Sequence, residues 1–499
     1  MKTDVLVIGY GYAGANAAIA AADAGAKVLL VEKAPAPGGI SVCSAGGLRI
    51  AADADRAFAY LRATCGGKTP DDVLRTLAQG MTTLAARVEH LAEGQGARLD
   101  SRPSPANYPF EGYETFGFAY VEDLDGFDPA DWPGIRGNDQ GAMLFRLIER
   151  CVAQRGGIET RTGTAVTRLT LDNGTVTGAT LDDGTAIEAG ATVLACGGFE
   201  AAPEMQAQYW EGGAALSAAY ALNTGDGIRM AQAAGADLWH MWHQHGCYGF
   251  AMPGYPFGVR VKRLPDWTPG PDGRPQKDLP VMAWILLDAG GHRFANEYDP
   301  YMQDTGARHL STMDPTRMRS PRNPAWFVTD AAGMAMYPLG KPTWNDPAHR
   351  YEWSPDNSRE LAAGLFTEAA DAGALASLIG APSEAVAMSL AHWQGIWATG
   401  QDPLGRPSDS LHPLAPPYFA APVVPVVSNT QGGPVHDAGQ RVLDPFGQPI
   451  PGLFAAGECG SAFGHLYMSG GNIAECFVGG EIAGRGAAQL ALAGPGTNI

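Results

Sequence analysis

The stretch Asp4-Val-Leu-Val-Ile-Gly-Tyr-Gly-Tyr-Ala-Gly14 decides the fold of this chain of 499 residues. Residues 4–9 form a mostly apolar run that predicts a β-strand, and the alanine-rich residues 13–24 predict a helix that Gly25 ends. The next apolar run, residues 27–32, predicts a second strand parallel to the first. Strand, glycine-rich turn, helix and parallel strand together predict a βαβ unit of the dinucleotide-binding type.

Four residues of this unit have roles that a dinucleotide would require. Gly9 would make the tight turn, Gly11 would let the backbone approach the pyrophosphate, and Gly14 would let the helix pack closely. Glu32 ends the second strand, eighteen residues after Gly14, and would bind the ribose hydroxyls. A glycine-rich turn can also serve only to pack a helix on a sheet, but the acid at the strand end favours the dinucleotide site.

The composition of the chain disfavours several other classes of protein. There are 34 Lys and Arg residues against 52 Asp and Glu, and the resulting net charge of −18 disfavours nucleic acid and anionic membrane surfaces as partners. The seven cysteines include no CxxC pair, so we expect neither a disulfide framework nor a metal site. The chain starts directly in the first strand and has no long apolar stretch, so we expect a cytoplasmic protein without membrane insertion.

Three further segments indicate which dinucleotide binds: Pro37-Gly-Gly-Ile-Ser-Val-Cys-Ser-Ala-Gly-Gly47, Val193-Leu-Ala-Cys-Gly-Gly198 and Pro451-Gly-Leu-Phe-Ala-Ala-Gly-Glu458. Together with Thr224-Gly-Asp-Gly-Ile-Arg-Met-Ala231 and Gly291-His-Arg-Phe-Ala-Asn-Glu297, they resemble the fumarate reductase and 3-ketosteroid dehydrogenase family of flavoproteins. The resemblance covers nearly the whole chain and implies FAD, and the sequence shows no second GxGxxG unit for NAD.

The resemblance also implies which residues hold the cofactor. In this family the loop after the ribose acid and a C-terminal segment both wrap the flavin ring. Respiratory members attach the flavin through a histidine in that loop, but residues 40–45 here read Ile-Ser-Val-Cys-Ser-Ala, so we expect non-covalent FAD. The expected cofactor-binding residues are Gly9, Gly11, Tyr12, Ala13, Gly14, Glu32, Lys33, Gly38, Gly39, Ile40, Ser41, Ala45, Gly46, Gly47, Ala165, Val166, Ala195, Cys196, Gly197, Gly198, Asn223, Gly225, Asp226, Gly457, Glu458, Asn472 and Ile473.

The expected fold class is α/β, or α+β overall, with a discontinuous Rossmann-like FAD-binding domain and an inserted α+β domain. The FAD-binding domain would comprise residues 1–236 and 426–499, with a β meander in residues 158–198. Residues 237–425 would form the substrate (capping and catalytic) domain and hold nine of the eleven tryptophans, as core residues or as the lining of an apolar pocket. Residues 253–280 are rich in proline and cations, which predicts an irregular connector or, alternatively, a lid.

Both arginines that the fumarate reductases carry in their active sites are missing from this sequence. Tyr301 lies four residues after Glu297, the position of their proton donor, and no arginine precedes Gly471, the position of their substrate clamp. Both segments are instead similar to the 3-ketosteroid Δ1-dehydrogenase pattern, NE-x-x-P-Y and Y-x-x-x-G. That resemblance implies that Tyr301 removes the α proton, and that Tyr467 with the Gly471 amide polarises the ketone oxygen.

Further candidates would assist these groups. A phenol with a pKa of ~10 is a weak base at neutral pH, so Tyr301 needs a relay partner. The family uses another tyrosine, for which Tyr108 is the nearest match, while Tyr113 and Tyr120 are the alternatives and would otherwise line the substrate pocket. His245 is the member of the histidine-rich stretch 240–245 that we expect to bind substrate.

We therefore expect an FAD-dependent dehydrogenase that desaturates the Cα–Cβ bond beside a cyclic ketone. The substrate would be a 3-ketosteroid or a smaller cyclohexanone such as an oxocyclohexanecarboxylate, apolar or weakly anionic. An external electron acceptor such as a quinone, oxygen or a dye would reoxidise the flavin. The alternatives are a flavin-dependent enone or enoate reductase of the fumarate reductase type, which would use the same residues in reverse, and a flavoprotein without catalytic activity.

Overall fold

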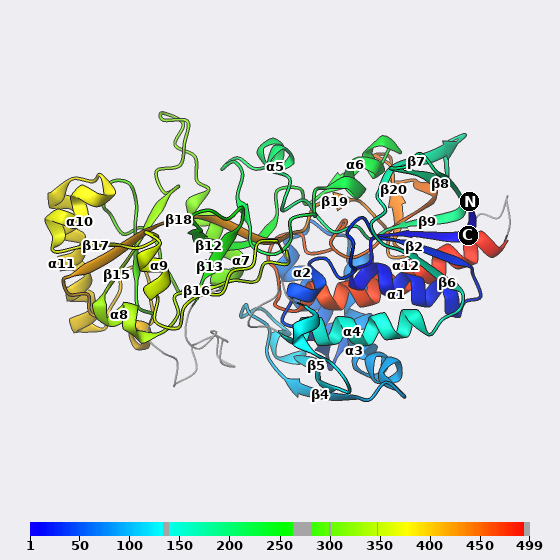
Figure 1. The fold of residues 1–499 in the computed structure, drawn as a ribbon, viewed down its shortest axis with the longest axis horizontal. Coiled ribbons are helices and arrows are strands. Elements are labelled where there is room, and N and C mark those ends of the chain that lie inside the picture. The colour runs from blue at the N-terminus through cyan, green and yellow to red at the C-terminus, as the bar shows by residue number, and fades with distance from the viewer. Residues whose placement is uncertain (133–138, 263–281, 299–300, 347, 494–499) are drawn as a thin grey trace. The chain divides into compact units, whose positions relative to one another are not determined.

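The computed structural model describes residues 1–132, 139–262, 282–298, 301–346 and 348–493. The chain folds into two compact units, each built from separate stretches of sequence (Figure 1). The first unit comprises residues 1–202, 220–244 and 429–499, and the second comprises residues 203–219 and 245–428. Residues 203–219 thus belong to the second unit, although the sequence-based division places them in the FAD-binding domain.

The first unit is built on a mixed eight-stranded sheet of order β20-β21-β9-β1-β2-β6, in which β8 also pairs with β9 and β7 pairs with β8. Strand β1 pairs in parallel with β2 and β9, and β9 pairs in parallel with β21. The βαβ unit predicted at the N-terminus is therefore present. The strands are β1 (Lys2–Ile8), β2 (Val28–Val31), β6 (Ile158–Arg161), β7 (Val166–Asp172), β8 (Thr175–Leu181), β9 (Ala186–Leu194), β20 (Arg441–Leu443) and β21 (Pro449–Ala455).

Two long glycine- and alanine-rich helices pack against each other beside this sheet. Helix α1 (Tyr12–Asp23) and helix α12 (Gly471–Ala493) approach so closely that a Cβ at Gly484 would lie 2.1 Å from the Ala17 carbonyl oxygen. Because α12 follows the segment 451–458 and α1 follows the glycine turn, this packing joins an N-terminal and a C-terminal helix of the chain (Figure 1).

The β meander predicted for residues 158–198 is also present. Strand β7 pairs with β8 and β8 with β9, both antiparallel. The β7–β8 turn contains Asn173 and Gly174, whose φ angles are 48° and 80°, in keeping with the preference of Asn-Gly pairs for such hairpin turns.

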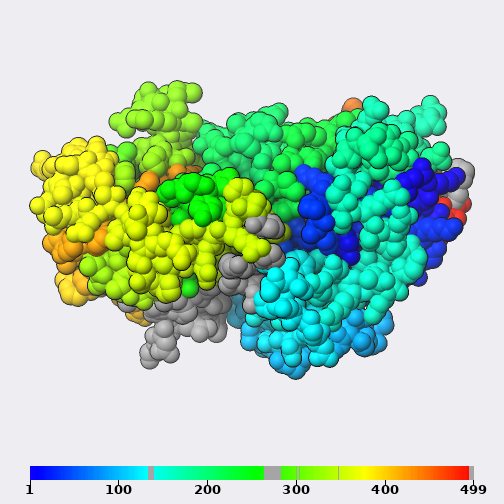
Figure 2. Space-filling view, viewed as in Figure 1, coloured from blue at the N-terminus to red at the C-terminus, as the bar shows by residue number. Residues whose placement is uncertain are grey.

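A smaller layer of the first unit carries residues 48–124. Strands β3 (Leu48–Ala51), β5 (Phe116–Leu124) and β4 (Ala97–Pro103) form an antiparallel sheet, and atoms of this layer, light blue to cyan, appear on the face shown in Figure 2. Four further helices of the first unit are α2 (Ala54–Cys65), α3 (Asp71–Ala92), α4 (Asp139–Ala153) and α6 (Asp226–Ala233). Strands β11 (Leu238–Trp239) and β19 (Gly433–Pro434) form a separate small antiparallel pair.

The second unit has its own eight-stranded sheet, of order β14-β15-β18-β12-β13-β16, with β10 and β17 paired to β18. The long strand β18 (Tyr418–Thr430) runs from this unit into the first, to which Asn429 and Thr430 belong. The other strands are β10 (Leu216–Ser217), β12 (Gln244–Ala251), β13 (Gly258–Val261), β14 (Ile285–Leu287), β15 (Ala325–Asp330), β16 (Gly340–Lys341) and β17 (Thr367–Ala369). The helices are α5 (Pro203–Tyr209), α7 (Met302–Thr305), α8 (Ala331–Met336), α9 (Ser358–Ala362), α10 (Ala372–Ile379) and α11 (Ser383–Thr399).

The tryptophans of the second unit are mainly core residues. Trp393 on α11 is 1% exposed and packs in a cluster with strands β14, β15 and β18, and Trp284 is equally buried. The prediction that residues 253–280 are irregular throughout is wrong, because β13 pairs with β12 and β16. The alternating valines Val259 and Val261 of this strand are buried, as expected for a strand with one face in the core. Residues 263–281, on which the connector and lid alternatives depend, lie outside the described residues.

No helix among the described residues is long and apolar enough to cross a membrane.

Candidate functional site

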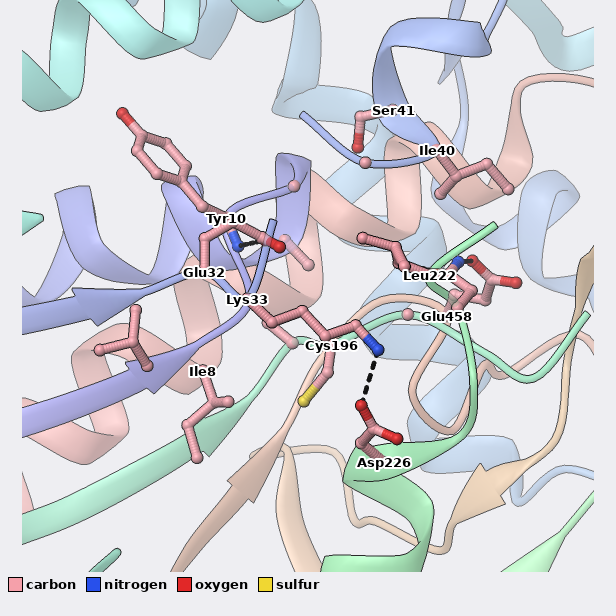
Figure 3. A pocket seen from close by; sticks show the side chains of 18 of the residues that line it. Ile8, Tyr10, Glu32, Lys33, Ile40, Ser41, Cys196, Leu222, Asp226 and Glu458 are labelled. Atoms are coloured by element: carbon pink, nitrogen blue, oxygen red, sulfur yellow. Dashed lines mark hydrogen bonds and ion pairs between the residues drawn. The ribbon is translucent and has the colours of Figure 1, made fainter. Parts of the chain in front are cut away.

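An open pocket lies in the first unit where the βαβ turn, the post-acid loop and the segment 195–226 converge (Figure 3). Eighteen of the predicted cofactor-binding residues line it: Gly9, Gly11, Tyr12, Ala13, Glu32, Lys33, Gly38, Gly39, Ile40, Ser41, Ala165, Val166, Ala195, Cys196, Gly197, Asn223, Asp226 and Glu458.

The glycine turn is shaped by close backbone contacts. Gly9 has a φ angle of 103°, and a Cβ there would lie 2.3 Å from the Ala195 carbonyl oxygen. A Cβ at Gly14 would lie 1.8 Å from the Gly9 carbonyl oxygen, so α1 can start directly against the turn only with glycine at this position. The N-terminus of α1 therefore opens at the cavity wall, where its amides and helix dipole favour an anionic group such as pyrophosphate.

Glu32 hydrogen-bonds to the backbone of the glycine turn and of the segment that follows it. Its carboxylate accepts the amide N–H of Tyr10 at 2.9 Å and that of Ala34 at 2.8 Å (Figure 3). A carboxylate has about four lone-pair sites, so these two bonds leave acceptor capacity for a ligand hydroxyl. Glu32 thus both fixes the turn and lines the cavity.

Lys33 and Asp226, which both line the cavity, form an ion pair. The Lys33 ammonium donates to the Asp226 carboxylate at 2.7 Å and to the Thr224 hydroxyl at 2.8 Å (Figure 3). Asp226 is the first residue of α6, and its other carboxylate oxygen accepts the Thr224 hydroxyl at 2.9 Å. The pair links the strand end after Glu32 to the motif at residues 224–231.

Two buried carboxyl groups meet beside the cavity. The Asn223 amide donates to Glu200 at 2.7 Å and to Glu458 at 3.5 Å, and Glu458 also accepts the Thr430 amide at 2.8 Å. Burial raises the pKa of Glu458 to about 7, and burial together with the neighbouring charge of Glu458 raises that of Glu200 well above its usual value.

Nine predicted cofactor residues do not line this cavity: Gly14, Ala45, Gly46, Gly47, Gly198, Gly225, Gly457, Asn472 and Ile473. Several of them instead permit close packing around it; a Cβ at Gly198 would lie 2.0 Å from the Thr430 hydroxyl oxygen. Sequence reasoning missed nine lining residues, although most directly adjoin predicted ones: Ile8, Tyr10, Val31, Thr164, Tyr220, Leu222, Met230, Ala456 and Cys476.

Tyr467 lies in a tight loop at the start of α12 in the first unit. Its hydroxyl oxygen accepts the amide N–H of Gly470 at 3.1 Å, and its ring packs edge-on against Phe463. The Gly471 amide, predicted as a second donor to a ketone oxygen, donates to the Met468 carbonyl at 2.8 Å. A ketone oxygen bound here would have to share that N–H with the Met468 carbonyl.

Tyr108 is held close to this loop. The neighbouring Asn107 side chain accepts the Ser469 amide at 2.8 Å, and the Tyr108 amide donates to the Tyr60 hydroxyl at 3.2 Å. Its alternatives lie in the same layer: Tyr113 forms a short helical turn, and Tyr120 on β5 packs against Gly47. The structure thus brings the segment of Tyr108 and the loop of Tyr467 together within the first unit.

Tyr301 and His245 come together in the second unit. Tyr301 precedes α7, is buried, and its ring centroid lies 6.1 Å from that of His245 on β12. The Tyr301 carbonyl accepts the amides of Asp304 and Thr305, which fixes the residue at the helix start.

The motif that precedes Tyr301 is anchored by a buried ionic cluster that the sequence did not reveal. Arg293 donates to Glu297 at 2.7 Å and to Asp402 at 2.8 Å, and Arg406 reaches Glu297 at 3.3 Å. Both guanidinium groups lie over the ring of Trp393. Burial alone would raise the pKa of Glu297, but the two arginines offset it and hold that pKa below its usual range.

Two histidines of the stretch 240–245 pair with backbone carbonyl oxygens. The two ring nitrogens of His240 face the carbonyl oxygens of Ser461 and Lys68, at 2.8 and 3.1 Å, and His243 meets the Phe463 carbonyl at 2.7 Å. Burial lowers the pKa of His240 to about 4. Among the described residues no group of three His, Cys, Asp or Glu side chains could hold a metal ion.

Comparison with known proteins identifies the family. The profile of the FAD binding domain family FAD_binding_2 matches residues 4–473. The chain belongs to this family. The cavity residues fit its cofactor, because the glycine-lined turn, the N-terminus of α1 and the Glu32 carboxylate supply the contacts that a dinucleotide needs.

Two relatives resemble this FAD-binding protein over nearly its whole length. It is 28% identical to the probable fumarate reductase Ifc3 of Shewanella frigidimarina, over 98% of this chain and 75% of the relative. It is also 28% identical to the 4-oxocyclohexanecarboxylate 2-dehydrogenase of Sinomonas cyclohexanicum, over 97% of this chain and 92% of the relative. The protein is an FAD-dependent oxidoreductase, and its relatives also include 3-oxosteroid 1-dehydrogenases, 26% identical over 96% of this chain.

A solved structure confirms the fold. The protein superimposes on the 3-ketosteroid Δ1-dehydrogenase of Sterolibacterium denitrificans, in complex with 1,4-androstadiene-3,17-dione, with a TM-score of 0.79 at 22% identity. The match covers 99% of this chain and 100% of that one. The mixed α/β architecture expected from the sequence is therefore confirmed.

Proposed function

We propose that this protein desaturates the Cα–Cβ bond beside the carbonyl of a cyclic ketone. The observation that carries the proposal is the Tyr467 loop, where the Gly470 amide donates to the Tyr467 hydroxyl oxygen at 3.1 Å. Because the phenol oxygen is the acceptor in this bond, the bond does not use the hydroxyl proton. In the proposed reaction Tyr467 donates to the ketone oxygen, which is what an enolate requires.

Tyr301 would act as the base that removes the α proton. It is a buried phenol at the start of α7, and the imidazole of His245 lies beside it. Imidazole is the side chain best suited to pass a proton near neutral pH, so His245 offers a relay within the second unit. Tyr108, the relay partner implied by the family resemblance, would serve from beside the Tyr467 loop.

The cofactor is proposed to bind in the cavity through the residues that line it. Bound FAD would supply the acceptor for the hydride that leaves the β carbon. Glu32 would hold the ribose, the N-terminus of α1 the pyrophosphate, and Lys33 would add a positive charge to the wall. Residues 40–45 contain no histidine, which supports non-covalent attachment.

We propose a cyclohexanone as the substrate, with an oxocyclohexanecarboxylate ahead of a 3-ketosteroid. The support is the relative that carries the name 4-oxocyclohexanecarboxylate 2-dehydrogenase, which this chain covers over 92% of its length. An external oxidant, such as a quinone, oxygen or a dye, would complete the turnover.

A reductase that saturates an enone or enoate is the second candidate. The similarity to a probable fumarate reductase favours it. Tyr301 would then donate the proton rather than accept it, and Tyr467 would still polarise the carbonyl. Against dicarboxylate reduction stands the tyrosine at position 301, where the resemblance implies an arginine in the reductases.

Substitution of Tyr301 by Phe tests the proposed reaction. The FAD-loaded Y301F protein should retain its flavin, yet lose at least about a hundredfold in the rate of flavin bleaching by a cyclic ketone without oxygen, the usual weight of one general base. Tyr209→Phe, on the exposed helix α5, is the matched control. Equal rates in Y301F and wild type would contradict the role of Tyr301.

A further inference from the structure

Arg49 is a buried cation directly beneath the Tyr467 loop. It lies on β3, is 1% exposed, and its guanidinium carbon sits 3.7 Å from the centroid of the Phe118 ring. Its Nε donates to the Ser469 carbonyl and its Nη1 to the Ser104 carbonyl, both at 2.8 Å. Arg49 therefore links β3 to both segments that carry the proposed tyrosines.

The bond to Ser469 has a consequence for Tyr467. The carbonyl that accepts from Arg49 and the Gly470 N–H that donates to Tyr467 belong to one peptide group. A cation on the carbonyl oxygen polarises the peptide and strengthens its N–H as a donor. A stronger donor on the phenol oxygen in turn strengthens the hydroxyl as a donor to a ketone oxygen.

The Ser469–Gly470 peptide is fixed on several sides. The Asn107 side chain accepts the Ser469 amide at 2.8 Å, and the Arg49 amide donates to the Gly470 carbonyl at 3.3 Å. Gly470 has a φ angle of 74°, and a Cβ there would lie 2.5 Å from the Gly47 carbonyl oxygen. The peptide therefore has little freedom to turn away from Arg49 or from Tyr467.

We propose that Arg49 is a positioning residue of the oxyanion site and acts on Tyr467 through the Ser469–Gly470 peptide. This inference rests on the proposed function of Tyr467. Neutral donors would satisfy the two carbonyls equally well, so the distinctive contribution of Arg49 is its charge. Arg49 does not itself touch the substrate in this account.

The first test measures binding of an oxyanion mimic. 4-Nitrophenol, a ring-sized phenol with a visible phenolate band, is titrated into the oxidised, FAD-loaded protein. Arg49→Gln keeps an N–H donor and removes the charge, whereas Arg49→Lys keeps the charge. We expect R49Q to weaken phenolate binding about tenfold, the weight of one charge-assisted hydrogen bond, and R49K to retain most of it.

A double variant separates an action through Tyr467 from a structural effect. If Arg49 acts through Tyr467, the R49Q/Y467F protein should bind 4-nitrophenol no more weakly than Y467F alone. Additive losses would overturn the inference. Arg87→Met is the control, because Arg87 is a half-buried arginine that also donates to a backbone carbonyl, that of Phe477 on α12.

The peptide itself offers a direct probe in the wild-type protein. The dipeptide Ser-Gly occurs once in the chain, at 469–470, so ¹³C′-serine and ¹⁵N-glycine labelling gives a single cross-peak for this group. We expect 4-nitrophenol to move the Gly470 amide proton downfield. An unmoved signal on saturation would overturn the relay even if R49Q failed to fold.

The outcomes distinguish this inference from the proposed function. If Y467F binds 4-nitrophenol as tightly as wild type, Tyr467 is not the donor and the proposed function fails at that residue. If Y467F weakens binding and R49Q does not, the role of Tyr467 stands and the inference about Arg49 falls.

Discussion

Asn107 and Ser469 lie 362 positions apart in the chain, yet the Asn107 side-chain oxygen accepts the Ser469 amide at 2.8 Å. This bond joins the segment of Tyr108 to the loop of Tyr467. The bond thus helps to hold these two segments against each other, together with the bonds from Arg49 to Ser104 and Ser469.

Removal of the Asn107–Ser469 hydrogen bond should lower turnover strongly and the free energy of unfolding only slightly. Asn107→Ala deletes one hydrogen bond and should cost about 1 kcal/mol of unfolding free energy. We expect ketone-dependent turnover to fall about tenfold because misplaced catalytic groups lose rate steeply. Steady-state rates and urea unfolding of N107A provide the check. Gln154→Ala, which removes an exposed bond to Gln95, should leave turnover unchanged.

Lys33 should contribute to FAD affinity through its charge. Lys33→Met removes the cation from the cavity wall, and FAD carries a negative pyrophosphate, so we expect FAD binding about tenfold weaker at low salt. Fluorescence titration of the apoprotein with FAD at low and high salt measures this. Lys27→Met, at the exposed start of the same strand region, is the control, and equal affinities of the two variants would exclude the role of Lys33.

The ionic cluster around Glu297 should make the second unit sensitive to acid. Glu297→Gln leaves Arg293 and Arg406 without this carboxylate, and loss of one partner of a buried pair costs about 3–5 kcal/mol. The pKa of Glu297 is lowered in the folded state, so its stabilisation is present above the unfolded value of ~4.3 and is lost as pH falls through the folded value.

Urea unfolding of E297Q and wild type at neutral and strongly acid pH tests this. The difference between them should be largest at neutral pH and shrink in acid. Glu159→Gln, in an exposed pair with Arg161, should change stability by less than about 0.5 kcal/mol. A constant difference across pH would show that charge is not the cause.

Glu475 should make the protein less stable as pH rises, whereas Glu297 makes it less stable as pH falls. It accepts the Ser461 hydroxyl at 2.7 Å and the Ala462 amide at 2.5 Å, and burial raises its pKa to about 7. Because the folded protein retains this proton longer than the unfolded chain, stability should decrease as pH rises from ~4.3 to about 7 and then level off.

Glu475→Gln should remove part of that decrease. We expect E475Q to gain on the order of 2–3 kcal/mol relative to wild type between pH 5 and pH 8, measured by urea unfolding of the FAD-loaded protein. Glu188→Gln, an exposed carboxylate, should show no such gain. If E475Q and wild type follow the same pH curve, the buried carboxyl is already ionised in the folded state.

The local parts of the fold could be predicted from sequence. The βαβ unit and the β7–β8 turn each depend on neighbouring residues, so periodicity and the Asn173-Gly174 pair were sufficient. The short strand β13 was missed because prolines and cations in residues 253–280 conceal the alternation of two valines.

The long-range parts of the candidate site could not be predicted. The motif ending in Glu297 is recognisable, but nothing in its own residues indicates that Arg406, 109 positions later, reaches its carboxylate. Arg49 likewise follows the glycine-rich loop without any sign that it meets Ser469. Such contacts are created by packing of distant segments, to which a single sequence gives no local signal.

The most direct test of the proposed reaction is an anaerobic titration of the FAD-loaded protein with 4-oxocyclohexanecarboxylate, cyclohexanone and a 3-ketosteroid. The oxidised-flavin band is followed, and the organic product is identified by mass spectrometry. We predict that one equivalent of a cyclic ketone bleaches the flavin and yields one equivalent of the conjugated enone, with the carboxylate reacting fastest. If no ketone bleaches the flavin, while the chemically reduced protein is reoxidised by the corresponding enones, the desaturation proposal is contradicted and the reductase alternative is supported.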